Sequence, residues 1–162
     1  MRGGEVRAVK WINHQVVTGV AVYTATSDLL LTAYSMAGAL LPDKLEGNPR
    51  AGNYWAWRSR HRGWSHWPVL YLALFGVSLH FARGDYGVSG GELATIGAFF
   101  AIGALLHIAE DATCGKVPLV TPSRKHGLKL YAVGSVFEYL FAIAIVLACY
   151  IGKRCMSGDF FT

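Results

Sequence analysis

Two histidines and an arginine lie close together in the segment 61–66, which has the sequence HRGWSH. Histidine is the commonest metal ligand in proteins. The spacing of His61 and His66 does not place both rings on one face of a helix. We therefore interpret them as loop ligands that Gly63 allows to point the same way. The plainer alternative is a pair of polar loop residues beside the apolar segment that begins at Pro68.

A second pair with metal-binding chemistry is His107 and Asp111. The spacing of four residues places both side chains on one face of a helix. A nitrogen and an oxygen on adjacent turns can bind the same ion. The alternative is that His107 makes a hydrogen bond within a helical bundle while Asp111 caps the following turn.

The composition limits the class of protein in which these residues occur. The chain has 162 residues, of which 53% are hydrophobic and 15% are charged. The charged fraction of an average soluble domain is about 25%, so residues 1–162 are predicted to form a single membrane-embedded domain. The net charge of +5 comes from basic residues in loops between apolar runs, as the positive-inside bias predicts. A nucleic-acid partner is therefore not expected.

The first apolar run, 15–41, has two interpretations. As one tilted helix it is long enough to cross a membrane, but Asp28 would then be a costly charge near mid-bilayer. We favour a hairpin of two short helices, 14–26 and 29–42, in which the chain turns at Ser27 and Asp28 caps the second helix. The hairpin brings both of its outer ends to the same side.

Further apolar runs predict helices at 68–82, 92–111 and 133–151, joined by irregular stretches at 44–67 and 112–130. The predicted fold class is all-α: a polytopic membrane helical bundle with about five membrane-embedded helices, the first two forming the short hairpin.

The hairpin gathers the titratable residues at one end of the bundle. A single first span would instead leave the earliest histidine on the opposite side. Because one zinc ion needs only four ligands, a set of four histidines and two aspartates predicts one or two divalent ions. Zinc is the first expectation, with manganese and iron as alternatives. The predicted metal ligands are His14, Asp43, His61, His66, His107 and Asp111.

Arg62 and Glu138 are the predicted catalytic residues outside this ligand set. Arg62 would neutralise a phosphate group held by the metal; otherwise it is a charge at the membrane surface. Glu138 lies inside the last apolar run, where it would be a further ligand or would accept a hydrogen bond from a histidine. The alternative for Glu138 is a surface carboxylate that reaches the interface.

The motifs resemble those of the YdjM-like family of bacterial membrane-bound metal-dependent hydrolases. The resemblance covers residues 14–138 and is carried by LPD at 41–43, HRGWSH at 61–66, Gly103, His107, DAT at 111–113, PL at 118–119 and Pro122. The pattern is also similar, more distantly, to zinc-dependent phospholipase C, which points towards phosphoester cleavage.

The resemblance implies a helical inner-membrane protein with a histidine–aspartate metal centre. By position, the six predicted ligands match the family's metal-binding candidates, and GSVFE at 134–138 matches a common ending that contains Glu138. One departure is at Leu45, where the family often has a second aspartate; here the residue after it is Glu46. This departure bears on whether a second metal site is complete.

The distribution of the 15 lysines and arginines predicts the orientation. Only Arg83, Lys153 and Arg154 lie at the end away from the predicted site, so the site is expected on the cytosolic side of the membrane. The predicted function is metal-dependent hydrolysis of a phosphoester in a lipid or lipid-linked substrate. The alternatives are hydrolysis of an amide or acyl ester and a non-catalytic membrane scaffold with a structural metal. The oligomeric state is not predicted.

Overall fold

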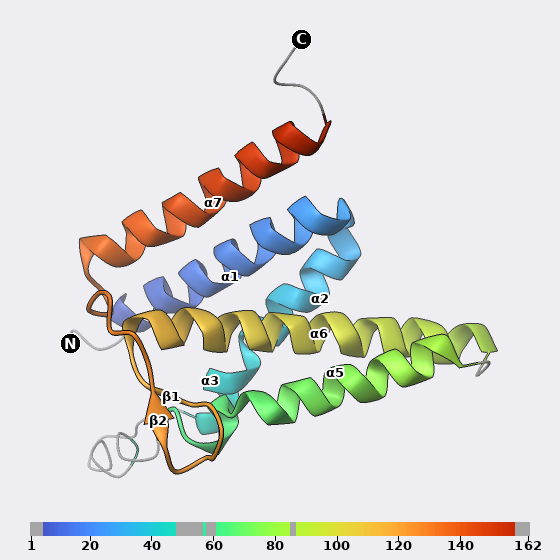
Figure 1. Cartoon of the computed structure of the whole chain (residues 1–162), viewed down its shortest axis with the longest axis horizontal. Helices are drawn as coiled ribbons and strands as arrows, with labels where there is room; N and C mark the ends of the chain where they lie inside the picture. Colours follow the sequence, from blue (N-terminus) through green and yellow to red (C-terminus); the bar gives the residue numbers. More distant parts are fainter. Residues whose placement is uncertain (1–4, 48–56, 58–60, 85–86, 158–162) are drawn as a thin grey trace.

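The computed structural model describes residues 5–47, 57, 61–84 and 87–157, and the chain there is mostly helical (Figure 1). The side chains of residues 5–11 and 87–89 lie outside the description.

The first two helices are α1 (Glu5–Thr26) and α2 (Leu29–Ala39). Asp28 is the N-cap of α2, and its Oδ1 accepts hydrogen bonds from the backbone N–H groups of Leu30 and Leu31 at 2.8 and 3.0 Å. The predicted turn at Ser27–Asp28 is therefore confirmed. The predicted start at residue 14 is wrong, because the helix continues towards the N-terminus through polar residues that an apolar pattern does not mark.

The helix α3 (Leu41–Glu46) follows α2 after a single residue. Its Pro42 occupies the first turn, where a missing N–H has no cost. We expected irregular structure from residue 44, but the helix continues to Glu46. Residues three apart on a helix are neighbours on its surface, so α3 presents Asp43 and Glu46 together.

The segment that carries the HRGWSH motif ends in the short 3₁₀-helix η1 (Trp64–His66). The preceding residues 48–56 and 58–60, within the predicted irregular stretch, lie outside the described residues.

The long helix α6 (Gly87–Cys114) runs antiparallel to α5 (Pro68–Arg83), as Figure 1 shows. Another neighbour of α6, the helix α2, makes backbone contact with it. A Cβ added to Gly103 would lie 1.8 Å from the carbonyl oxygen of Ser35, and one on Gly38 would lie 2.0 Å from that of Phe100. Small residues allow helix backbones to approach closely, and these two glycines fix the position of α6 against α2.

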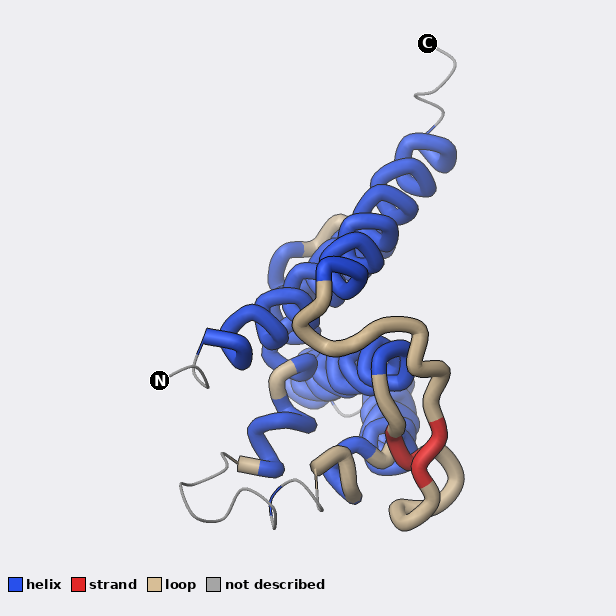
Figure 2. Tube along the Cα trace, turned by 90° about the vertical axis from the view of Figure 1, so that its left-hand side faces the viewer, coloured by secondary structure: helices blue, strands red, loops and turns tan. Residues whose placement is uncertain are grey.

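The irregular stretch after α6 contains two short strands, β1 (Val117–Pro118) and β2 (Lys125–His126). They pair antiparallel, with Val117 opposite His126, so the all-α prediction is incomplete in this detail. Figure 2 shows the pair at the lower right, connected by loops to the helices.

The last helix, α7 (Val136–Ser157), packs beside α1 and runs in the same direction (Figure 1). It begins three residues later than predicted, after Gly134 at a φ of 82°, which is a conformation that favours glycine. It also ends beyond the predicted residue 151, because polar residues continue the helix past the apolar run.

Within the described part of the chain, two helices are long and apolar enough to cross a membrane: 90–114 within α6, and α7. The prediction of about five membrane-embedded helices is supported only to that extent. By helical rise, α5 is about 24 Å long and α2 about 17 Å, both shorter than a hydrocarbon core of about 30 Å. The most apolar stretch of α7 contains no buried residue, and large apolar side chains such as Leu140, Ile143 and Leu147 are exposed along it.

Candidate metal centre

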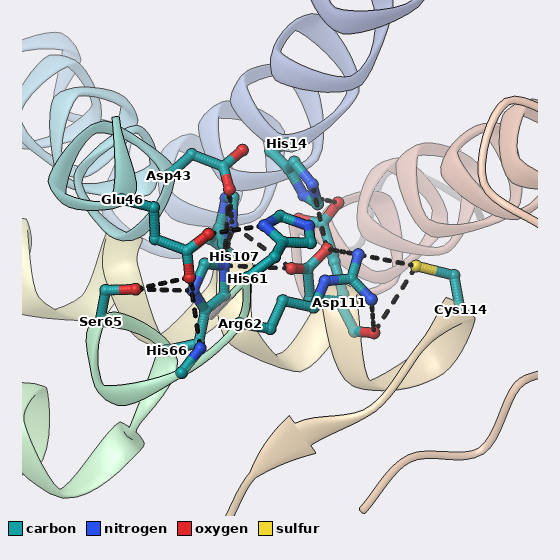
Figure 3. A network of polar contacts seen from close by, with 12 residues as sticks. His14, Asp43, Glu46, His61, Arg62, Ser65, His66, His107, Asp111 and Cys114 are labelled. Atoms are coloured by element: carbon teal, nitrogen blue, oxygen red, sulfur yellow. Dashed lines mark hydrogen bonds and ion pairs between the residues drawn. The ribbon is translucent and has the colours of Figure 1, made fainter. Parts of the chain in front are cut away.

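The histidine His66 is held at the centre of the site by η1 and is fully buried. Its Nδ1 lies 2.9 Å from Glu46 Oε1 and 3.1 Å from Ser65 Oγ. A carboxylate accepts hydrogen bonds, so Nδ1 is the protonated nitrogen. A metal-binding histidine characteristically donates its other N–H in this way, and here Nε2 is directed to the group of residues shown in Figure 3.

Four donor atoms lie close to one another between α3, η1 and α6. His66 Nε2 lies 3.5 Å from Asp43 Oδ1 and 3.2 Å from Asp111 Oδ2. His107 Nε2 lies 3.8 and 3.7 Å from the same two oxygens and 3.4 Å from His66 Nε2. Corners of a tetrahedron around zinc, with bonds of about 2.0–2.1 Å, are about 3.3–3.4 Å apart. The two imidazole nitrogens therefore lie from each other and from the two oxygens at about the separation of ligands on one ion, and we call the four side chains the four-donor cage. Within it, Asp43, His66 and His107 form a candidate ion-binding group whose three donor atoms all lie within 4.8 Å of one another.

The electrostatics of the cage favour a cation. Burial acts to lower the pKa of His66, but the carboxylates around it outweigh burial and raise that pKa to about 10. Burial acts to raise the pKa of Asp43, but contact with His66 and His107 lowers it. Asp43 and Asp111, which help to stabilise the protonated form of this buried imidazole, would also stabilise a divalent ion at its Nε2.

Asp111 has a different neighbour on each of its oxygens. Oδ2 belongs to the cage, whereas Oδ1 accepts a hydrogen bond from Arg62 Nη2 at 2.7 Å. His14 Nε2 lies 3.6 Å from the same Oδ1. The guanidinium that we predicted to bind phosphate is thus engaged with a carboxylate in the structure.

His14 lies beside the cage, not in it. Its ring centroid is 4.1 Å from that of His107, and its Nδ1 lies 3.0 Å from Glu110 Oε2. His14, His107 and Asp111 have donor atoms close enough to form a second candidate ion-binding group. The sequence analysis did not identify Glu110, although it follows His107 by three residues on the same helix.

His61 lies outside the four-donor cage. Its Nδ1 contacts Glu46 Oε2 at 2.5 Å, and its ring stacks on Trp57 at a centroid distance of 4.4 Å. With Asp43 and Glu46 it forms a third candidate group for an ion. Glu46, which the sequence analysis noted only as a departure from the family pattern, therefore contacts both histidines of the HRGWSH motif.

Glu138 does not contact a histidine through any hydrogen bond in the described structure. Its carboxylate accepts hydrogen bonds from Asn13 Nδ2, at 3.0 Å, and from the backbone N–H of Gly134. The predicted role as acceptor for a histidine is filled instead by Glu110 towards His14. Glu138 connects the start of α7 to α1.

A cavity of about 80 Å³ lies beside the cage. Its lining includes the polar side chains of His14, Arg62 and Asp111 and the apolar side chains of Phe141 and Ala142 of α7. The cavity thus joins one face of the candidate metal centre to the apolar helix α7.

Exposed apolar helices around a buried histidine–carboxylate cluster define a membrane helical protein with a candidate metal centre. A family model described as YdjM inner membrane protein matches residues 10–160. The chain therefore belongs to the family of YdjM inner membrane proteins. No curated protein and no solved structure shows a significant match.

Proposed function

We propose that the protein is a membrane-bound metal-dependent hydrolase that cleaves a phosphoester of a lipid or lipid-linked molecule. The observation that carries this proposal is the four-donor cage beside a cavity that is lined by both polar and apolar side chains. Zinc fits the mixed nitrogen and oxygen donors, and manganese or iron are alternatives.

The residues of the centre would have different roles in hydrolysis. A divalent ion in such a cage supplies Lewis acidity and lowers the pKa of water. His66, His107, Asp43 and Asp111 would hold the ion, and Glu46 orients His66 through its Nδ1. The carboxylate of Asp43, whose side chain is 19% exposed, lines the cavity, so water would reach the ion-binding residues from that side.

The cavity supports an amphiphilic substrate. Its lining includes Asp43 and Asp111 of the cage, and also Phe141 and Ala142 on α7, a helix whose most apolar stretch is unburied. A headgroup beside the cage would leave a hydrocarbon chain beside α7, in contact with the bilayer.

A structural metal site in a membrane scaffold is the second candidate. Structural zinc sites are closed by four protein ligands, whereas catalytic sites keep a position for water. The number of cage residues favours the structural site, and the exposure of Asp43 at the cavity favours the catalytic one. Hydrolysis of an amide or acyl ester is a further alternative, since the same metal chemistry serves it.

The hydrolase proposal is tested with the purified chain in detergent micelles. Phosphate release from phosphatidate and from isoprenyl phosphates is measured together with metal content. We expect wild-type activity that a chelator removes and zinc or manganese restores, and we expect His66→Ala and Asp111→Ala to reduce activity to the chelated background. A protein that binds metal, loses stability on chelation and hydrolyses no phosphoester or acyl ester would support the scaffold.

We further propose that the site lies on the cytosolic side. The helix α7 starts beside Asn13 at the site end and runs away from it, so a cytosolic site requires a periplasmic C-terminus. A C-terminal alkaline phosphatase fusion is then expected to be active and a C-terminal green fluorescent protein fusion dark. The reverse pair of results would place the site in the periplasm.

A further inference from the structure

We propose that the guanidinium of Arg62 occupies the position of a second cation, so that the centre holds one divalent ion. This inference deepens the proposed function and rests on its metal centre. Residues that could hold two ions are present, and the structure fills the second position with a side chain of the protein.

The second position is defined by Asp111 and His14. Carboxylates bridge the ions of two-metal sites, which lie about 3.5–4 Å apart. Asp111 is placed to bridge, because Oδ2 faces the cage and Oδ1 lies 3.6 Å from His14 Nε2. With His14 Nδ1 donating to Glu110, the Nε2 of the neutral ring has a lone pair for an ion.

Arg62 fills this position. Its Nη2 donates to Asp111 Oδ1 at 2.7 Å, and its Nη1 donates to the backbone carbonyl of Asp111 at 3.4 Å. Figure 3 shows the guanidinium between Asp111 and Cys114, on the side of Asp111 away from His66. A second divalent ion on Oδ1 would meet a fixed positive charge at contact distance, and arginine does not lose its charge in proteins.

The local structure holds the guanidinium in place. Arg62 has a φ of 55°, a conformation that a residue with a side chain adopts only where the surrounding structure maintains it. A Cβ added to Gly115 would lie 1.7 Å from Arg62 Nη1, so the guanidinium packs directly on that glycine. The backbone before Arg62 is held by Lys125 Nζ, which donates to the carbonyl oxygen of His61 at 2.7 Å.

The third candidate group, Asp43 with Glu46 and His61, is not a comparable second site. Both oxygens of Glu46 are engaged by histidines, Oε1 by His66 Nδ1 and Oε2 by His61 Nδ1. Oε1 also accepts a hydrogen bond from Ser65 at 2.8 Å. An ion here would have to break the contacts that orient His66 towards the cage.

The test is the number of ions bound per chain. The full chain, stripped of metal and held in detergent micelles, is titrated with Zn²⁺ by calorimetry, and retained zinc is measured after gel filtration. We expect one equivalent for wild type and for Arg62→Lys, which keeps a cation. We expect a second equivalent for Arg62→Ala and its loss again in Arg62→Ala/His14→Ala.

A second variant and a second measurement support the test. If Arg62→Ala fails to fold, Gly115→Ala displaces the guanidinium by steric clash and is expected to admit the second ion. Electron paramagnetic resonance of Mn²⁺-loaded protein is expected to show an isolated ion in wild type and a coupled pair in the variant.

The inference is overturned by two equivalents in wild type, or by a folded Arg62→Ala that still binds one. Either result can occur with active enzyme, which would leave the proposed hydrolase intact. One equivalent with no hydrolysis would instead reject the hydrolase and retain the inference.

Discussion

A single carboxylate, that of Glu46, organises both histidines of the HRGWSH motif. It accepts from His66 Nδ1 on one oxygen and from His61 Nδ1 on the other, and Gly63 N–H donates to it at 3.3 Å. These contacts bind α3 to the loop that precedes η1. The orientation of the His66 nitrogen that faces the cage is therefore set by a residue that does not itself belong to the cage.

Glu46→Gln tests this role. The amide keeps the size of the side chain but weakens acceptance from two imidazoles, so we expect zinc affinity to fall by about 10–100-fold, as for other residues that support metal ligands. Competition with a chromophoric chelator measures the affinity. The matched control is Glu92→Gln, at an exposed position near the start of α6, which is expected to leave affinity unchanged. Equal affinities for all three proteins would contradict the role.

The sequence identified the donor types better than their partners. Asp43, His66, His107 and Asp111 were all predicted ligands, and the structure places them in one cage. The predicted hydrogen-bond partner was less accurate. We expected Glu138 to accept from a histidine, but the carboxylates that contact histidines are those of Glu46 and Glu110. Which acidic side chain meets which ring depends on the rotation of each helix about its axis, and residue spacing constrains this only within one helix.

At the scale of the elements, the contact between α2 and α6 determines where the ligands meet. Gly103 lies one helical turn before His107, and Gly38 lies five residues before Asp43. Ser35 Oγ also donates to the carbonyl of Phe99 at 2.9 Å across the same interface. The backbone contact at the two glycines thus fixes the distance between the two halves of the cage.

Gly103→Ala is expected to disturb the cage from a distance. The new methyl would meet the Ser35 carbonyl, so the helices must separate, and overpacking of this kind costs about 1–3 kcal/mol of unfolding free energy. We expect weaker zinc binding as well as lower stability in detergent denaturation. Gly76→Ala in α5 is the control, because nothing lies within 4 Å of its added Cβ. Similar losses in the two variants would contradict the role of the contact.

The elements differ in how well the sequence predicts them. The break at Ser27–Asp28 was predictable because a charged residue that caps a helix interrupts an apolar run. The helix α3 was not predictable, because its six residues, LPDKLE, are too few to show an apolar period. Its helical structure depends on packing against η1 and α6. That helix aligns Asp43 with Glu46, so missing it also concealed the partner of both histidines.

At the scale of the whole molecule, polar and apolar side chains are arranged as a membrane requires. Of the side chains that the structure describes, the largest fully buried ones are His66 and His107, whereas Leu140, Ile143 and Leu147 are exposed on α7. Burial of charged groups inside, with apolar groups outside, matches the inner-membrane family to which the chain belongs.

Leu147→Arg tests whether the outer face of α7 contacts lipid. Leu147 lies near the middle of α7 and is 53% exposed, and an arginine at a membrane helix centre costs about 2.5–3.5 kcal/mol. We expect less protein in the membrane fraction after alkaline carbonate extraction. Met156→Arg is the control, since an arginine near the end of the helix can reach the interface. Equal extraction of both variants would show that this face does not contact lipid.

The burial of the two cage histidines has a consequence for the order of events at the site. Among the described residues, the cavity wall includes Asp43 and Asp111 but neither His66 nor His107. An ion that enters through this cavity would therefore pass the two carboxylates, in the space that a headgroup would fill. Loading by this route would precede substrate capture, and an amphiphile held in the cavity should slow the removal of the ion by a chelator.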